Sequence, residues 1–460
     1  MNKRLILIVA LAAGGCSLAP EYKRSAAPVP DAWPTKVSAS QTALKFSDDW
    51  RTFFTDSTLQ GLIAAALEHN RDLKIAVARV NEARAQAGLV RADRLPTIDV
   101  NAQRQAGRTP ADLSPTGRQF SSQRYDANLG VAAFELDFWG RVKNLDDAAR
   151  ANFLASDYAQ RSFRLTLISD VASAWFALRE LTERAMLADT VVKSREESRR
   201  LIEARRDVGL AGDLDFLTAD AAWQGARAEA ANLARQQSAA ENALLLLVGN
   251  VLPSLSLATP AGPVAEIAVD VPSEVLLRRP DVLAAEQKLI AAHANIGAAR
   301  AAFFPRISLT ATAGSASSAL AGLFAGGSGA WSFLPLLKFP LFDSGRTAAN
   351  VDVAEARKVI AVAEYEKTIQ QAFREVADLL AAREQYAVQL AALDAASTAQ
   401  GERLLRVEAR HKAGVSSYLE LLDAQRDQFA AQQSALAVRR AWLTTTASLY
   451  KSLGGEASSR

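Results

Sequence analysis

The chain has 460 residues, 49% of them hydrophobic, and its 53 lysines and arginines nearly balance 50 aspartates and glutamates. Both signs of charge are scattered, which gives no support for a nucleic-acid partner, and the single cysteine excludes disulfides within the chain and thiolate metal sites. After the N-terminus no run of about 18 residues is apolar throughout, so a bundle of transmembrane helices is excluded and any membrane crossing must use strands.

The N-terminus has the features of a secretory signal. Residues 1–15 combine a positive start, a short apolar stretch and small residues before Cys16. A cysteine at this position resembles the lipobox of bacterial lipoproteins, although Ala13 stands where leucine is usual. We therefore predict a signal peptide at 1–15 and lipidation of Cys16; a plain signal peptide with an incidental cysteine is the alternative. Ser17 fits lipoproteins that are sent to the outer membrane, and the proline-rich residues 16–45 are predicted to form an extended, lipid-anchored tether.

Residues 46–250 form the first of two similar halves. The segment from Leu59 to Arg94 carries one apolar stripe at helical spacing and ends before Pro96. Two segments between 96 and 138 then alternate apolar with polar or small side chains, which predicts a strand hairpin. This alternation is compatible with a half-buried soluble sheet and with a membrane barrel that has a wet lumen.

A very long helix is predicted after the hairpin. From Arg141 to Val208 neither glycine nor proline interrupts the chain, and at ~1.5 Å per residue this stretch makes one helix of roughly 100 Å. After a turn at Gly209, a further helix is predicted over 213–248. Helices that line a wet tube need narrow apolar seams and small residues, which the alanine-rich runs supply.

The second half repeats the first. After a linker at 251–272, residues 273–455 are predicted to contain a helix, a strand hairpin at 305–342, a long helix at 346–413 and a helix at 417–453, followed by a tail at 456–460. Glycines at the helix ends recur at one offset (345 − 140 = 414 − 209 = 205), so the chain is a tandem duplication. Two hairpins give only four strands, and we expect other copies of the chain to cover the sheet edges.

Aromatic side chains flank the predicted strands and allow two interpretations. They suit the girdles of membrane strands at the lipid interface, and they equally suit packing at a strand-to-helix junction. The residues are Tyr125, Phe134, Phe138, Trp139, Trp331, Phe333, Phe339 and Phe342.

Four stretches of the sequence carry a resemblance to a known family. They are Cys16-Ser17-Leu18-Ala19-Pro20-Glu21-Tyr22, residues 272–286 with Leu276-Leu277-Arg278-Arg279-Pro280-Asp281 at their centre, Phe304-Pro305, and residues 414–423 leading into Ala424-Gln425. With these stretches the mature chain resembles the TolC-type outer-membrane efflux factors. Within them it is similar to the lipid-anchored (NodT-like) branch that serves resistance-nodulation-division multidrug or metal pumps.

The resemblance implies a mainly α fold with a membrane β-barrel. In that arrangement a tandem-repeat α-helical barrel crosses the periplasm, and each chain of a homotrimer gives four strands to a twelve-stranded barrel. It also implies a palmitate-carrying outer membrane lipoprotein whose partners are a periplasmic adaptor (membrane fusion protein), an inner-membrane pump and outer membrane lipid. The expected function is the exit duct of a tripartite efflux system, which conducts substrates passively. A lipid-anchored periplasmic helical scaffold without a pore is the alternative.

Acidic residues gather at the two turns that follow the long helices. Copies of the chain would repeat each acid as a ring, which favours cations and repels like charge where the mouth narrows. By resemblance, Asp215 matches the family's closing network, and Glu420 and Asp423 match its acidic ring, so these three residues are the expected periplasmic gate. A local role is the alternative, because Ser417 to Glu420 has the pattern of a capping box and acids suit the first turn of a helix.

No catalytic constellation stands out. His69, His293 and His411 are isolated on helical stretches, where we expect surface positions, and the sequence has no HExxH, P-loop or GxSxG motif. We therefore expect no enzyme activity, no cofactor and no metal site. Ala211 and Ser416 occupy turn positions where relatives often carry a charged or polar constriction residue, so the resemblance does not fix how tightly the mouth closes.

Overall fold

A computed structural model describes residues 17–30, 33, 49–249 and 273–455. The predicted signal peptide, Cys16, the linker at 251–272 and the tail at 456–460 lie outside the described residues. The chain divides into two compact units. Among the described residues, unit 1 comprises 17–26, 79–157 and 284–366, and unit 2 comprises 27–30, 33, 49–78, 158–249, 273–283 and 367–455.

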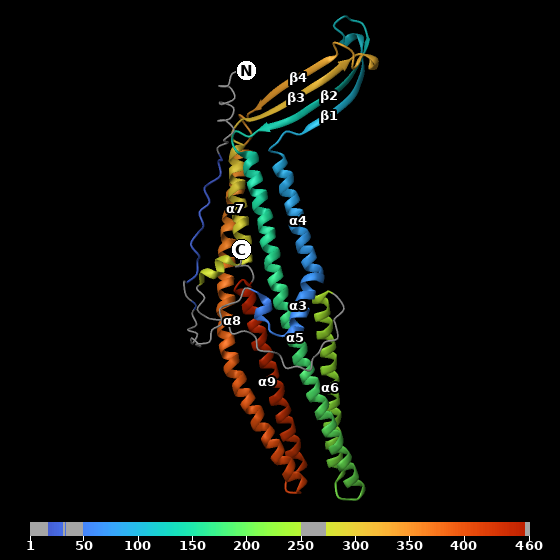
Figure 1. The fold of residues 1–460 in the computed structure, drawn as a ribbon, viewed down its shortest axis with the longest axis vertical. Coiled ribbons are helices and arrows are strands. Elements are labelled where there is room, and N and C mark those ends of the chain that lie inside the picture. The colour runs from blue at the N-terminus through green and yellow to red at the C-terminus, as the bar shows by residue number, and fades with distance from the viewer. Residues whose placement is uncertain (1–16, 31–32, 34–48, 250–272, 456–460) are drawn as a thin grey trace. The chain divides into compact units, whose positions relative to one another are not determined.

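One antiparallel sheet belongs to unit 1 (Figure 1). Its strands follow each other in chain order: β1 (Ile98–Thr109), β2 (Phe120–Leu136), β3 (Arg306–Ser317) and β4 (Gly329–Lys338). The two predicted hairpins therefore join through β2 and β3, where Leu136 lies opposite Ile307. Within the described part of the chain no strand pairs with the outer side of β1 or β4, so both edges carry backbone groups that another strand can bind.

A β-bulge interrupts the regular alternation that the sequence predicts for β2. Val131 lies opposite Ala311 and Phe134 lies opposite Leu309, so β2 has one residue more than β3 over this stretch. Ala133 takes a left-handed backbone angle there (φ 49°), and its N–H donates to Thr310 Oγ1 at 3.1 Å. The extra residue reverses which face of the sheet the following side chains take.

Two helices of equal length begin directly after the sheet. α5 (Arg141–Asp207) and α8 (Arg346–Lys412) have 67 residues each, which corresponds to about 100 Å at ~1.5 Å per residue. α6 (Asp213–Val248) and α9 (Tyr418–Ser452) return after the turns (Figure 1). Among the helices of the described ranges, none combines the length and the apolar character that a membrane span requires.

The continuous helix predicted from Leu59 to Arg94 is broken, and the prediction was wrong at this point. α3 (Ser57–His69) ends at Asn70, whose backbone is extended (ψ 130°), and α4 (Arg71–Ala92) begins at the next residue. The Asn70 amide explains the break. Its oxygen accepts from the backbone N–H of Leu73 at 2.8 Å, and its nitrogen donates to the carbonyl of Leu247 at 2.8 Å. Asn70 therefore caps α4 and ties this corner to the end of α6.

An aromatic core holds unit 2 together. α2 (Trp50–Phe53) brings Phe53 into the interior, where its ring lies 4.9 Å from that of Tyr450 in α9. Trp175 of α5 is fully buried and donates from Nε1 to Asp56 at 3.1 Å. Because large rings bury more apolar area than alanine seams do, the strongest packing of unit 2 lies around these side chains.

The aromatic residues near the strands divide between the two interpretations. Trp139 packs at the junction, since its ring stacks on Phe304 at 4.6 Å and its Nε1 donates to the carbonyl of Pro305 at 2.9 Å. Trp331 and Phe342, by contrast, are 81% and 88% exposed. Exposed rings at the strands are typical of a girdle at a lipid interface.

The described start of the chain, residues 17–26, lies on unit 1 as a strap. Ser17 Oγ donates to Asn144 Oδ1 of α5 at 2.8 Å. Arg24 donates from Nε and Nη2 to the two carboxylate oxygens of Glu286 at 2.7 and 2.5 Å, and the Tyr22 hydroxyl donates to the same carboxylate at 2.8 Å. Glu286 belongs to α7 (Pro280–Ala301) and is 4% exposed, so the strap supplies the countercharge of a buried acid.

Candidate functional site

The two turns that follow α5 and α8 share one geometry, and both belong to unit 2. Gly209 and Gly414 adopt left-handed backbone angles (φ 76° and 75°), which side chains disfavour. In each turn the next N–H reaches the carbonyl five residues earlier, from Leu210 at 2.7 Å and from Val415 at 2.9 Å. Both are Schellman-type helix ends, so the duplication extends to the backbone hydrogen bonds.

Asp215, one of the predicted gate residues, caps the helix in which it stands. Its carboxylate accepts from the backbone N–H of Gly212 at 3.2 Å, and Gly212 is the N-cap residue of α6. A negative charge in the first helical turn is also favoured by the helix dipole. In the single chain the role of Asp215 is therefore local.

Glu420, the second predicted gate residue, is held within its own turn. Its backbone N–H donates to Ser417 Oγ at 3.2 Å, the N-cap bond expected from the sequence. The reciprocal half of the predicted capping box is not formed among the described residues, because the Glu420 carboxylate accepts from the Ser416 hydroxyl instead. The other carboxylate oxygen lies 3.9 Å from Arg410, and His411 Nδ1 lies 3.0 Å from the carbonyl oxygen of Ser416.

Arginines stand beside the other acids of this turn. Asp423, the third predicted gate residue, lies 3.3 Å from Arg426. Asp427 lies 2.7 Å from Arg403 and 3.3 Å from Arg426, and the hydrogen bond from Arg403 is the main cause that lowers the pKa of the Asp427 carboxyl. Glu420, Asp423 and Asp427 therefore each have an arginine of the same chain within 4 Å, which reduces the bare negative charge at the turn.

Apolar packing joins α8 to α9 near the second turn. Val407 of α8 packs with Leu421 and Ala424 of α9 in a buried cluster, and Leu404 and Tyr418 pack against it. Such a cluster resists opening because separating the helices would expose all of these side chains to water.

Charged contacts with aromatic rings join α5 to α6 near the first turn. The Arg199 guanidinium lies 5.1 Å from the ring centre of Phe216 and 5.3 Å from that of Trp223, and it donates to Asp220 at 2.7 Å. Arg206 lies 4.2 Å from the same Phe216 ring. These cation–π contacts were not predicted from the sequence. The arginines at helical spacing in one segment, with a Phe and a Trp in the next, could have indicated them.

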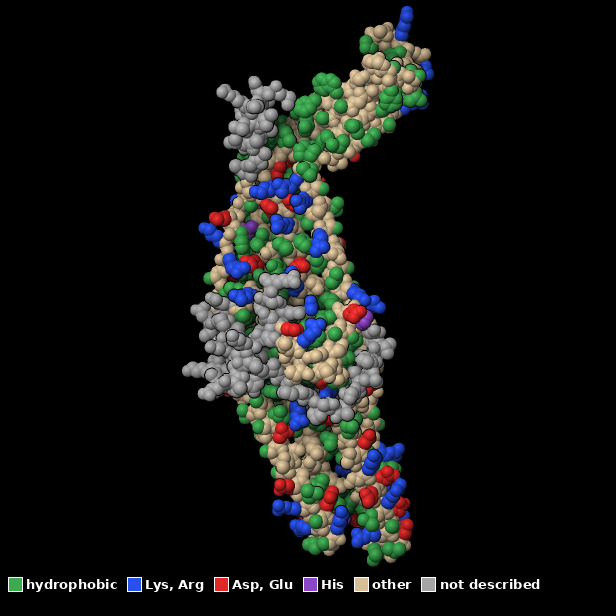
Figure 2. Space-filling view, in the orientation of Figure 1, with side chains coloured by type: hydrophobic (Ala, Val, Ile, Leu, Met, Phe, Trp, Pro, Cys, Tyr) green, Lys and Arg blue, Asp and Glu red, His purple; other side chains and the backbone are tan. Residues whose placement is uncertain are grey.

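Large apolar side chains are exposed at both turns, among interspersed acidic and basic groups (Figure 2). They are Val208, Leu210, Leu214 and Leu217 at the first turn, and Val415 and Leu419 at the second. An exposed patch of this kind, rimmed by charges, is typical of a surface that another protein covers.

The histidines differ from the expectation of surface positions, since all three are half-buried. His293 lies edge-on to the Tyr22 ring of the strap, and burial is the main cause that lowers its pKa. In the described part of the chain no cluster of three or more histidine, cysteine, aspartate or glutamate residues is arranged to hold a metal ion.

A family model covers most of the chain. The model described as "Outer membrane efflux protein" matches residues 62–250 and 271–455, so each matched range contains one strand hairpin, one long helix and one returning helix. The chain belongs to this family. Two relatives are similar in sequence to this efflux protein along nearly their whole length. Outer membrane protein OprJ of Pseudomonas aeruginosa is 43% identical over 455 residues, which are 98% of this chain and 95% of OprJ. Toluene efflux pump outer membrane protein TtgC of Pseudomonas putida is 41% identical over 465 residues, 99% of this chain and 96% of TtgC.

Solved structures share the fold of this efflux protein. A crystal structure of a membrane protein from Pseudomonas aeruginosa has a TM-score of 0.88 at 41% identity and covers 96% of this chain and 98% of its own. The open state of the MtrE outer membrane channel of Neisseria gonorrhoeae has a TM-score of 0.85 at 38% identity, over 96% and 98%.

These relatives decide between the two functions left open by the sequence. The predicted function, an outer membrane efflux channel, is confirmed, and so are the outer membrane location and the fold class, mainly α with a membrane β-barrel. The alternative of a periplasmic scaffold without a pore was wrong. The family and the relatives are transport proteins.

Proposed function

We propose that three copies of this efflux protein form the exit duct of a tripartite efflux system. The observation that carries the proposal is the four-stranded sheet, whose edge strands β1 and β4 are unpaired in the described chain. Three such sheets joined β4 to β1 make a closed barrel of twelve strands and leave no edge. The long helices α5 and α8, with α6 and α9, would then line one tube.

The proposal includes an anchor and partners. Signal peptide 1–15 is removed, Cys16 is acylated, and residues 16–45 connect the anchor to the two repeats at 46–250 and 273–455. A periplasmic adaptor covers the exposed apolar side chains at the helical turns and joins the duct to an inner-membrane pump. The pump supplies the energy and selects the substrate, and the duct itself conducts passively, without catalysis or a cofactor.

The gate of the proposed duct consists of Asp215, Glu420 and Asp423. What supports it is their place in the two turns that follow the long helices, where three copies would bring them around one axis. The neighbouring Arg410 and Arg426 shape how such a gate works. Closing would exchange partners among acids and arginines of adjacent copies, in place of confronting bare carboxylates.

Imaging of detergent-purified mature protein as single particles tests the duct. We expect a trimer with a hollow helical tube and a strand barrel at one end. A monomer, or a solid rod without a lumen, would overturn the proposal.

Conductance tests the gate separately. In planar bilayers the double variant Glu420→Gln with Asp423→Asn is expected to lose cation preference and to open more often than the parent. The control is Glu402→Gln with Glu408→Gln, an exposed and a half-buried α8 acid outside the three gate residues, and it should behave as the parent. Parent-like selectivity and opening in the gate variant would remove these residues from the gate and leave the duct in place.

A further inference from the structure

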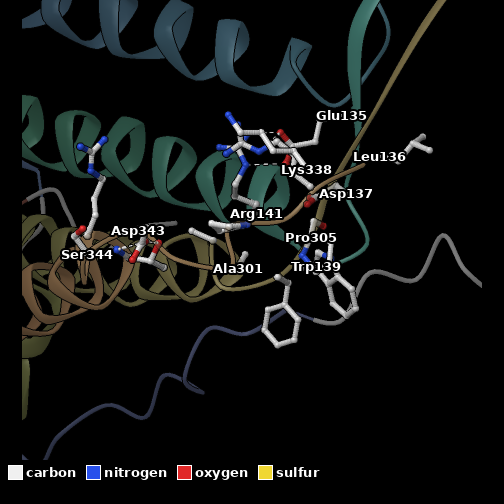
Figure 3. Close-up of a pocket in the computed structure, with 16 residues that line it drawn as sticks. Glu135, Leu136, Asp137, Trp139, Arg141, Ala301, Pro305, Lys338, Asp343 and Ser344 are labelled. Atoms are coloured by element: carbon white, nitrogen blue, oxygen red, sulfur yellow. Dashed lines mark hydrogen bonds and ion pairs between the residues drawn. The ribbon is translucent and has the colours of Figure 1, made fainter. Parts of the chain in front are cut away.

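A cavity of about 610 Å³ opens in unit 1 where the strands meet the helices (Figure 3). The end of β2 with the start of α5, the end of α7 with the start of β3, and the end of β4 with the start of α8 all line it. It lies beside the strands of unit 1. Its lining is strongly charged, with four cations, Arg141, Arg306, Lys338 and Arg346, and three acids, Glu135, Asp137 and Asp343.

The three acids of this cavity are already occupied. Asp137 accepts from the backbone N–H of Lys143 at 2.7 Å and so caps α5. Asp343 accepts from the backbone N–H of Thr347 at 2.8 Å and caps α8; the hydrogen bonds from Thr347 are the main cause that lowers the pKa of its carboxyl. Glu135 accepts two hydrogen bonds of 2.7 Å from Arg141.

Two cations of the cavity have no charged partner within the described residues. Arg306 lies 3.4 Å from Glu135, but its cross-strand neighbour Lys338 and the helix residue Arg346 have no hydrogen bond or ion pair from their side chains within the described residues. Like charges directly opposite on a sheet destabilise it unless an anion lies between them. The cavity therefore has an excess of positive charge that this chain does not neutralise.

The tandem duplication shows where the missing acid would be. At the offset of 205 that relates Arg141 to Arg346, Glu135 corresponds to Pro340, which also lines the cavity. Arg141 of the first repeat therefore has a carboxylate partner, whereas its counterpart Arg346 has a proline at the corresponding position. Leu341 and its neighbour Phe342 are 89% and 88% exposed, so an apolar surface borders the cationic one.

The strap places a lipid next to this cavity. Ser17 is bonded to Asn144, one helical turn after Arg141, and the residue before Ser17 is Cys16. If Cys16 is acylated, as in the proposed function, its acyl chains must enter the membrane close to the first turn of α5. The periplasmic surface of the outer membrane then lies at the level of the cavity, and phospholipid headgroups surround it.

We propose that the cavity binds the phosphate of a phospholipid headgroup, with Lys338 and Arg346 as its charged ligands and Leu341 and Phe342 against the start of the acyl chains. The inference rests on the proposed function for the position of the membrane. Phosphate suits the site because it accepts several charge-assisted hydrogen bonds at once, and its esterified chains match the apolar border.

Native mass spectrometry of full-length protein in mild detergent tests this site. After delipidation, phosphatidylglycerol is added back and the lipids retained per protomer are counted. The parent is expected to retain phosphatidylglycerol. Lys338→Gln with Arg346→Gln is expected to reduce retention about tenfold or more, since bonds from charged groups are lost. The control, Lys288→Gln with Arg357→Gln, removes two exposed helix cations outside the cavity and should retain lipid as the parent does.

A second variant keeps the test sharp if the double variant folds poorly. Pro340→Glu adds, at the equivalent position in the cavity lining, the acid that the first repeat has, and it should also expel the lipid while leaving both cations in place. Parent-like retention in Pro340→Glu and in the double variant would overturn the site. So would an equal loss in the control, or complete displacement of the lipid by inorganic phosphate, which would make the ligand a free anion. Bilayer conductance of the same parent sample judges the proposed duct independently, because a conducting protein without lipid retention fails only the present inference.

Discussion

Arg279 Nη1 donates to the carbonyl oxygen of Ser452 at 2.8 Å and thereby joins the start of α7 to the end of α9. The same guanidinium donates to Asp281 at 3.0 and 2.7 Å and to Glu375 of α8 at 2.9 Å, and Arg279 is 5% exposed. The Arg-Pro-Asp stretch, which carries part of the family resemblance, therefore holds several elements of unit 2 together. One planar side chain with five donors satisfies three elements at once.

Replacing Arg279 should loosen unit 2. Arg279→Met is expected to cost about 3 kcal/mol, because it leaves acids and a carbonyl without their buried donor. Amide hydrogen exchange at the end of α9 measures the loss. Arg278→Met removes an exposed neighbouring arginine and should change exchange little. Equal protection in the two variants would show that the Arg279 contacts do not hold α9.

The strap should detach when its buried acid is neutralised. Glu286→Gln removes the charge that Arg24 and the Tyr22 hydroxyl bind, and each lost hydrogen bond to a charged group is worth about 1.5–3 kcal/mol. Hydrogen exchange and limited proteolysis over residues 17–26 are expected to speed up. Glu21→Gln, whose side chain is 84% exposed, is the control and should leave the strap protected. Unchanged protection in Glu286→Gln would mean that packing alone seats the strap.

Gly297 leaves the space in which the strap lies. A Cβ at this position would come 2.7 Å from the backbone nitrogen of Ala19 and 2.6 Å from Asn144 Nδ2. Gly297→Ala is therefore expected to displace the strap and to destabilise unit 1 by about 1–3 kcal/mol, although alanine favours helix. In Gly88→Ala the new Cβ meets nothing within 4 Å, and that helix should gain roughly 0.5–1 kcal/mol. Thermal unfolding of both variants distinguishes the two effects, and a stabilised Gly297→Ala protein would contradict the contact.

Acid should weaken the second turn through Asp427. Because the hydrogen bond from Arg403 lowers the pKa of Asp427 in the folded chain, the pair stabilises the hairpin above the ordinary aspartate pKa and is lost as the pH falls through the lowered value. Hydrogen exchange near Arg403, followed downward from neutral pH, should show this loss. Asp427→Asn should remove that part of the pH dependence and leave the turn already loosened at neutral pH. If Asp427→Asn kept the parent's pH profile of hydrogen exchange, the pH dependence would come from other groups.

The regular elements were predictable because their signals are long and local. About 68 residues without glycine or proline fix α5 whatever surrounds them, and the two-residue period fixes the strands. Asn70 was missed because its break depends on a carbonyl in α6 that is distant in sequence. The bulge at Ala133 was missed because an alanine gives no sign of a left-handed angle.

The candidate site was predicted less completely than the fold. The acids of the turns could be found because they stand beside glycines that end helices, but their arginine partners come from the facing helix. Arg403 stands 24 residues before Asp427, and helical periodicity does not report such a pairing. The cationic cavity depends on three separate chain segments and could be recognised only once the sheet register placed Lys338 opposite Arg306.

The bond between Ser17 and Asn144 has a mechanical consequence. A membrane anchor on a long flexible tether lets the protein move and tilt relative to the bilayer without transmitting force. Here an acylated Cys16 would have a single peptide unit of slack before the chain is fastened to α5. Such a short attachment transmits force, so a local change in bilayer thickness would pull directly on the first turn of the 67-residue helix.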